Sequence, residues 1–327
     1  MICFLISLQG PLQRNVVYFW SVIFNCIIFA SKKVDDAMRN YSLDTLKIIC
    51  AICVIYIHTP KPEILSDYIT PIIRCAVPIF FMISGYFTYG KTNLNNTLRR
   101  RIVEQLKIFA WALALYFIVF LIKDGKGALN YISSLATPVF FMFNFIKCGE
   151  HLWYILAYIY VLVIMLFVEK YNLYKLLFYM TPVLLTVALL AGSYSEILIG
   201  RSLPACYTRN FLFTGLPFFT LGMMVKSIRY KIPISALITF CTIFYIFGIF
   251  ENTKMNLSNS ELFLSTPFLA VAIFVLFLNI NQIKDNIFSK TGREDGLYIY
   301  VLHFFIAMYV AEYRAEFPQL LYIGPIL

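Results

Sequence analysis

The stretch KIICAICVIYIH, Lys47–His58, decides the fold class of this chain. Ten residues that are apolar, Cys or Tyr separate one cation from one imidazole. With its neighbours the run covers residues 43–60, which suits a helix that crosses a lipid bilayer and needs about 17–25 residues. A cation and an imidazole are costly in a hydrocarbon layer, so the same helix also raises the question of function.

Similar apolar runs recur along all 327 residues, of which 61% are hydrophobic and only 13% charged. Soluble domains average about 25% charged residues. We therefore predict an all-α, polytopic membrane protein with about ten transmembrane helices. The segment 131–147 is apolar but broken by Pro138, which predicts a re-entrant or interfacial piece. The predicted spans are residues 43–60, 69–90, 102–122, 152–168, 173–191, 209–226, 232–250, 261–280 and 297–313, with a tenth that begins near Pro318.

The charge pattern predicts an orientation for these spans. A net charge of +10 would suggest nucleic acid in a soluble protein, but here Lys and Arg beside the spans set the topology. Nucleic acid is therefore not an expected partner. With the residues before Asp44 inside, every second turn is rich in cations, as the positive-inside rule requires.

Residues 1–40 form an N-terminal extension or an extra hydrophobic segment, and residues 41–327 form the membrane domain. The stretch VVYFWSVIFNCIIFA, 16–30, resembles a short span or a signal-like segment, and Met38 is an alternative start. Among eight cysteines, Cys50 and Cys53 form a CxxC inside an apolar run without a second pair. Such cysteines are typical small core residues, so no metal site is expected.

One face of the first predicted span carries three polar side chains. Lys47 and His58 are eleven residues apart, which places them about 20° from eclipsed and about 16 Å apart along a helix. Asp44 lies three residues before Lys47 on the same face. Lys47 reaching the headgroups and His58 capping the outer end is one interpretation. Function is the other, and three such groups on one face favour it.

The other polar groups in or beside the spans also have two interpretations. A neutral His can serve as a base and then as an acid near neutral pH, which suits a catalytic role for His151 and His303. His151 also suits an aromatic belt at the membrane surface, and His303 also suits an interhelical hydrogen bond. Arg74 lies in or at the outer edge of the second span, and Pro78 is expected to break the helical hydrogen bonding within that span. The run Arg99, Arg100 and Arg101 is a topology signal or an anion site, because Arg clusters suit phosphates.

Taken together, the chain resembles the acyltransferase-3 family of integral-membrane O-acyltransferases. The resemblance rests on LDTLKIICAICVIYIH, VPIFFMISGYF, the Arg run, HLWYILAYIYVL, RNFLFTGLPFFTLG and GLYIYVLH in this order, over about residues 40 to 310. All three His of the chain fall within these segments. The family pattern has Arg eleven residues before the catalytic His, whereas Lys47 stands there in this chain.

The resemblance implies an acyl donor used from the cytosol, usually acetyl-CoA, and a hydroxyl of a cell-surface glycan or its lipid-linked precursor as acceptor. It implies a multi-pass protein of a bacterial inner membrane. His58 is the expected general base or transient acyl carrier, and Lys47 and Asp44 orient groups beside it. The expected contacts with CoA are Arg99, Arg100 and Arg101, and those with the acceptor are Arg74, His151, Arg209 and His303.

Two alternatives come from other functional classes. Polar residues on one helix face also suit the permeation path of a transporter or flippase. A non-catalytic sensing module derived from the same family is the second alternative. Consumption of acyl-CoA separates the enzyme from both.

Overall fold

The computed structural model describes residues 40–123, 133, 135, 137–144, 150–228, 232–255, 257, 261–280, 284–294 and 296–313. The predicted extension before residue 40 and the tenth span near Pro318 lie outside these residues, as do residues 131, 132, 134, 136 and 145–147 of the segment 131–147. Every regular element within them is a helix. This confirms the predicted all-α class.

The longer helices coincide with the predicted spans. They are α3 (Tyr41–His58), α4 (Glu63–Ile73), α5 (Ala76–Tyr86), α6 (Leu94–Lys123), α9 (Trp153–Lys170), α10 (Tyr174–Ala191), α12 (Leu216–Ser227), α13 (Ile234–Lys254), α14 (Ser265–Asn279) and α16 (Gly296–Tyr313). The shorter elements are α8 (Pro138–Phe143), η1 (Glu150–Leu152), α11 (Ser195–Ile199), η2 (Ala205–Tyr207), the π-helix η3 (Phe211–Gly215) and α15 (Ile287–Glu294).

Five of these segments are long and apolar enough to cross a membrane, namely α3, α4 with α5, α9, α10 and α13. Two further apolar segments, η3 with α12 and α14, are shorter. The protein is therefore a helical membrane protein, and the count of ten spans stays a prediction.

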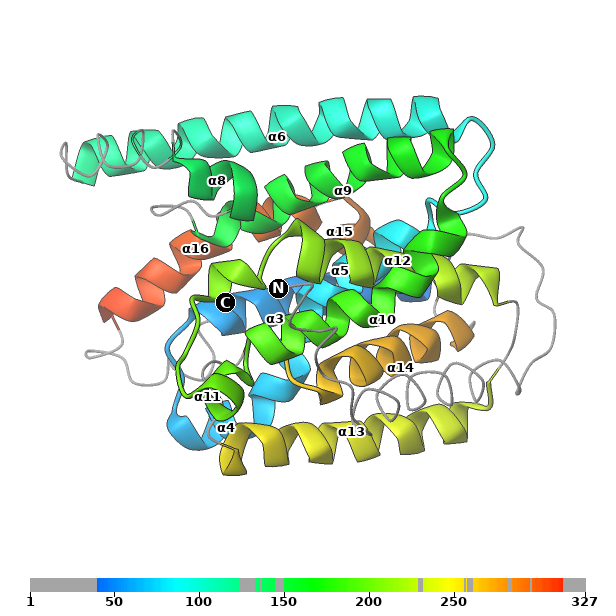
Figure 1. Ribbon diagram of the computed structural model, residues 1–327. Coiled ribbons are helices and arrows are strands. Elements are labelled where there is room, and N and C mark those ends of the chain that lie inside the picture. The colour runs from blue at the N-terminus through cyan, green and yellow to red at the C-terminus, as the bar shows by residue number, and fades with distance from the viewer. Residues whose placement is uncertain are drawn as a thin grey trace.

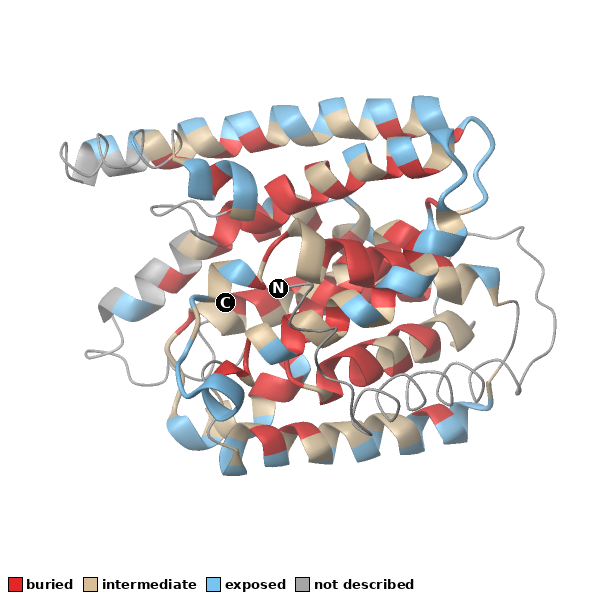
Figure 2. Ribbon diagram, in the orientation of Figure 1, coloured by how far each residue is buried: buried red, intermediate tan, exposed pale blue. Residues whose placement is uncertain are grey.

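The helices lie side by side in one bundle (Figure 1). Helices α3, α5 and α12 occupy its centre, while α6 and α13 form opposite edges. Buried residues concentrate in the central helices, and the outward faces of α6 and α13 are exposed (Figure 2). Exposed apolar residues on α13, such as Ile238 and Ile246, suit contact with lipid tails.

Two glycines bring α5 and α12 into backbone contact. A Cβ atom on Gly85 would lie 1.9 Å from the carbonyl oxygen of Phe219, and one on Gly222 would lie 2.0 Å from that of Met82. Small residues of this kind let transmembrane helices approach closely. The contact fixes the spacing of the two helices that lead to the candidate site.

The second predicted span is broken, and the break lies at a different residue from the one expected. Helix α4 ends at Ile73 and α5 begins at Ala76, so Arg74 and Cys75 stand between them. Pro78 is the third residue of α5, where the first-turn position needs no intrahelical donor. The proline therefore starts a helix, and the interruption falls one turn earlier.

A buried carboxylate holds the start of α14. Glu251 of α13 is fully buried and accepts hydrogen bonds from the backbone N–H groups of Leu264 at 2.8 Å and Ser265 at 2.9 Å. The Tyr194 hydroxyl donates to the same carboxylate. An anion at a helix N-terminus satisfies unpaired N–H groups and complements the helix dipole. This capping fixes the segment around Glu261, which precedes α14.

Candidate functional site

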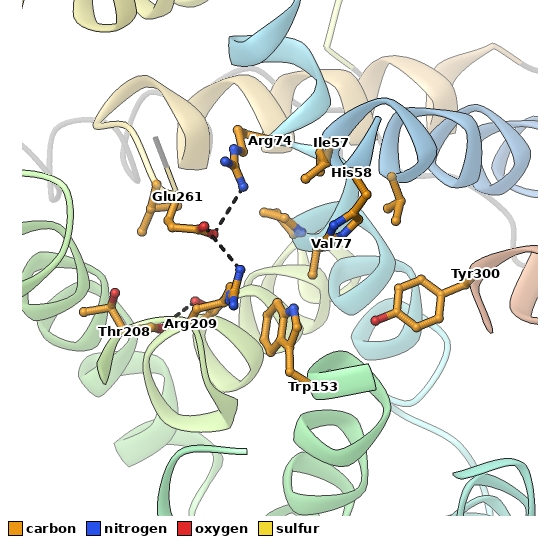
Figure 3. A pocket seen from close by; sticks show the side chains of 13 residues that line it. Ile57, His58, Arg74, Val77, Trp153, Thr208, Arg209, Glu261 and Tyr300 are labelled. Atoms are coloured by element: carbon orange, nitrogen blue, oxygen red, sulfur yellow. Dashed lines mark hydrogen bonds and ion pairs between the residues drawn. The ribbon is translucent and has the colours of Figure 1, made fainter. Parts of the chain in front are cut away.

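A pocket opens where the ends of several helices meet (Figure 3). His58 is the last residue of α3, and Trp153 is the first residue of α9. Tyr300 comes from α16 and Thr214 from η3, and the other polar residues come from non-helical segments. The lining consists of Val54, Ile57, His58, Arg74, Val77, Pro78, Trp153, Thr208, Arg209, Thr214, Glu261, Leu262 and Tyr300.

Glu261 joins two arginines across this pocket. Its Oε2 lies 3.2 Å from Nη1 of Arg74, and its Oε1 lies 3.3 Å from Nη1 of Arg209. Figure 3 shows the carboxylate between the two guanidinium groups. The three side chains are 17–20% exposed, so water screens these ion pairs less than surface pairs. Burial raises the pKa of the Glu261 carboxyl, but Arg74 and Arg209 outweigh it and hold the pKa below its ordinary value.

Local structure positions each arginine. Arg74 occupies the break between α4 and α5, and Arg209 lies two residues before η3 begins. The Asn210 side chain caps η3 by accepting from the N–H groups of Leu212 at 2.9 Å and Phe213 at 3.1 Å. A single π-helical turn inside a helix frequently marks a functional site. The guanidinium carbon of Arg209 also lies 6.0 Å from the centre of the Trp153 ring, within reach of a cation–π interaction.

The three histidines of the chain lie together, although 245 positions separate the first number from the last. The His303 ring centre is 4.9 Å from that of His58 and 5.5 Å from that of His151. Nδ1 of His303 donates to the Tyr300 carbonyl oxygen, which leaves Nε2 as the acceptor nitrogen of this ring. His58 lines the pocket, whereas His151 and His303 are buried behind it.

The buried histidines connect three helical elements. The Tyr300 hydroxyl donates to the backbone carbonyl of His151, and the Tyr116 hydroxyl donates to that of Val301 at 2.7 Å. The His151 ring stacks on Phe304 with centres 4.7 Å apart. These contacts tie α6, η1 and α16 together behind the pocket. Nε2 of His151 and Nε2 of His303 have no hydrogen-bond partner among the described residues.

Lys47 and Asp44 lie outside the pocket. Lys47 Nζ pairs with Asp44 Oδ1 at 2.8 Å, one helical turn from the start of α3. Helix α15 packs there, since a Cβ on Gly292 would lie 2.0 Å from the Asp44 carbonyl oxygen. The first helix therefore carries its polar groups at opposite ends, and only His58 reaches the pocket. The roles predicted for Lys47 and Asp44 remain predictions.

The Arg99–Arg101 run lies in the first turns of α6. Arg101 donates to the Thr88 hydroxyl at 2.8 Å, and Arg100 pairs with Glu104 at 3.6 Å on an exposed face. Partial burial and the neighbouring charges of Arg101 and Arg100 lower the pKa of the Lys91 ammonium. The crowding of three cations suits an anion such as a phosphate.

The structure thus gathers His58, Arg74 and Arg209 in one pocket and places His151 and His303 directly behind it. Sequence reasoning missed Glu261, and its one signal was an acid immediately before an apolar run. Trp153 and Tyr300 lie within the motifs HLWY and GLYIYVLH, yet neither was singled out. Among the described residues, no group of three or more His, Cys, Asp or Glu side chains is arranged to hold a metal ion.

Two curated proteins are similar to this chain over most of its length. A protein named amino-acid racemase from Enterococcus faecalis is 26% identical over 312 residues, which cover 86% of this chain and 43% of the relative. A serine/alanine racemase from Enterococcus gallinarum is 25% identical over 292 residues, which cover 81% and 40%. The chain therefore spans less than half the length of these relatives.

No solved structure matches the chain. Residues 40–327 match the family described as "Acyltransferase domain". This stretch contains all the segments on which the resemblance rested, together with the pocket and the histidine cluster. The chain therefore belongs to the acyltransferase-3 family of membrane proteins.

Proposed function

We propose that this protein is a membrane O-acyltransferase of a bacterial inner membrane. It moves an acyl group, preferably acetyl, from cytosolic acyl-CoA to a hydroxyl of a cell-surface glycan or its lipid-linked precursor. One observation carries the proposal. In a chain of this family, the His58 imidazole lines a pocket together with two paired arginines.

The residues of the pocket suit each requirement of acyl transfer. The neutral His58 imidazole takes the proton of the acceptor hydroxyl, whose oxygen attacks the thioester carbonyl carbon. The carbon–sulfur bond then breaks, and His58 returns the proton to the departing thiolate, so that protons balance. The cationic groups of Arg74 and Arg209 stabilise the negative charge that develops on the carbonyl oxygen. In a variant of this scheme, the acyl group moves first from CoA to His58 and then from His58 to the acceptor hydroxyl.

The cations near Arg101 are the proposed contact for the phosphates of CoA. Arg101 binds Thr88, beyond the far end of α5, whereas Arg74 precedes the near end of the same helix. The fourteen residues from Arg74 to Thr88 rise about 21 Å at helical geometry. A thioester at the end of a long, thin arm bridges such a distance. Arg101→Gln should therefore raise the KM for acyl-CoA more than it lowers kcat.

The proposal is tested with labelled acetyl-CoA added to the cytosolic face of membrane vesicles. Wild type is compared with His58→Ala, and Ile49→Ala serves as a matched control on an exposed face of the same helix. Label in a glycan or lipid fraction that is lost only with His58→Ala supports the proposal. Full transfer by a folded His58→Ala variant contradicts the role of His58, and no label in any fraction contradicts acetyl transfer.

A transporter or sensor of amino acids is the second candidate function. The two similar proteins are named as racemases of amino acids, and the pocket offers both guanidinium groups and a carboxylate. A zwitterionic amino acid carries the two complementary charges. Uptake of labelled serine or alanine into proteoliposomes, with no consumption of acetyl-CoA, would favour this candidate over the enzyme.

A further inference from the structure

The pocket carries more positive than negative charge. Arg74 and Arg209 line it, and Glu261 is the only acidic residue among the described residues of the lining. Two guanidinium groups against one carboxylate leave a positive excess in the pocket.

Arg74 has a buried donor available for a further ligand. Its Nη1 pairs with Oε2 of Glu261 at 3.2 Å, which is longer than the about 2.7–2.9 Å of close charge-assisted pairs. Nε of Arg74 is buried and has no hydrogen-bond partner among the described residues. A buried donor without a partner is unfavourable. An oxyanion bound by the Arg74 fork satisfies this donor.

The remaining lining combines an aromatic wall with an imidazole. Trp153 offers an aromatic surface beside Arg209, and the His58 imidazole lies in the same pocket. Ligand pockets typically combine such aromatic and apolar walls with a few charged groups that fix orientation. Figure 3 shows the charged side chains on one side of the pocket and His58 beside them.

We propose that this pocket selects an acceptor that carries an oxyanion, either a carboxylate or a phosphate, close to the hydroxyl that is acylated. The inference rests on the proposed function and names the acceptor class for the same site. The oxyanion binds Arg74 and Arg209, Glu261 holds the two guanidinium groups apart for it, and the sugar ring of the acceptor lies against Trp153. The acceptor hydroxyl then faces His58.

Equilibrium dialysis of the purified protein in detergent tests this selection without acyl transfer. The labelled probes are methyl β-D-glucuronide, glucose 6-phosphate and the neutral methyl β-D-glucoside. At least one acidic probe should bind about ten- to a hundredfold more tightly than the glucoside, the effect of hydrogen bonds to a charged group. The carboxylate and phosphate arms show which oxyanion is preferred.

Matched variants assign the preference to the pocket. Arg74→Gln and Arg209→Gln should each remove most of the preference, whereas Arg201→Gln, at an exposed position, should retain it. Added salt should weaken the acidic probe and leave the glucoside unchanged.

Equal binding of all probes, no binding of either acidic probe, or a preference that persists in both pocket variants would overturn the inference. Failure of the proposed function is separate. It would appear as selective binding of the acidic probe without transfer of label from acetyl-CoA. Transfer of label to neutral acceptors alone would instead support the proposed acyltransferase activity and refute the proposal that the acceptor is acidic.

Discussion

The glycine contact between α5 and α12 should control activity from a distance. Gly85→Ala adds a Cβ that would lie 1.9 Å from the Phe219 carbonyl oxygen. Ordinary contact begins near 3.4 Å, so the two backbones must separate by about 1.5 Å. Overpacking of this kind costs about 1–3 kcal/mol in unfolding free energy. Because Arg74 precedes α5 and Arg209 precedes the segment that leads into α12, the same separation changes the spacing of the pocket arginines.

A misplacement of about 1 Å at a catalytic site can lower the rate about a hundredfold. We therefore expect Gly85→Ala to lose thermal stability in detergent, measured by intrinsic fluorescence, and about a hundredfold in kcat/KM for acyl transfer. Gly296→Ala is the matched control, since a Cβ there meets nothing within 4 Å. A Gly85→Ala protein with the stability and activity of this control would refute the reasoning. Gly222→Ala, which meets the Met82 backbone at 2.0 Å, should reproduce the Gly85→Ala result.

Three further outcomes are expected from measurements of stability. The ion pairs lower the pKa of Glu261, so its contribution is complete above the ordinary carboxyl pKa and is lost as the pH falls through the lower folded value. The stability difference between wild type and Glu261→Gln should therefore be constant near neutral pH and shrink in acid, and a difference that grows in acid would contradict the pairing. Glu251→Gln should lose about 1.5–3 kcal/mol, because two N–H groups at the start of α14 lose a charged acceptor, and unchanged thermal unfolding would contradict the cap. Lys47→Met and Asp44→Asn should couple by about 0.5–3 kcal/mol in a double-mutant cycle, whereas additive effects would show that their 2.8 Å contact contributes nothing.

The helices were predictable because their signal is local. Apolar runs of membrane-spanning length identified all the long helices, with ends that differ by a few residues in most cases. The break in the second span was misplaced, because a proline marks the start of a helix as readily as an interruption. Helix α15 was not predicted, since its eight residues between two spans contain cations that read as a topology signal.

The candidate site was only partly predictable. His58, His151 and His303 were recognisable because ionisable residues are rare in spans, and the family segments contain all three. Their mutual contact depends on the packing of α16 against α3 and η1, which no local pattern encodes. Glu261 lies 187 positions from Arg74 and 52 from Arg209, so nothing in the sequence links it to either. Lys47 and His58 were correctly placed on one face of the helix. However, they lie about 16 Å apart along it, so Lys47 lies near the start of α3 and His58 lies at the pocket.

The pocket is built almost entirely from the ends of helices. His58 ends α3, Arg74 interrupts a span, Trp153 begins α9, Arg209 precedes a π-helical turn and Glu261 precedes α14. Residues at helix ends keep their relative positions only if the helices keep their spacing. Substitutions at the glycine contact should therefore impair activity although these residues do not line the pocket. Substitutions on the lipid-facing surface of α13 should leave the activity unchanged. Such a pattern would distinguish a preorganised pocket from one that forms only when a substrate binds.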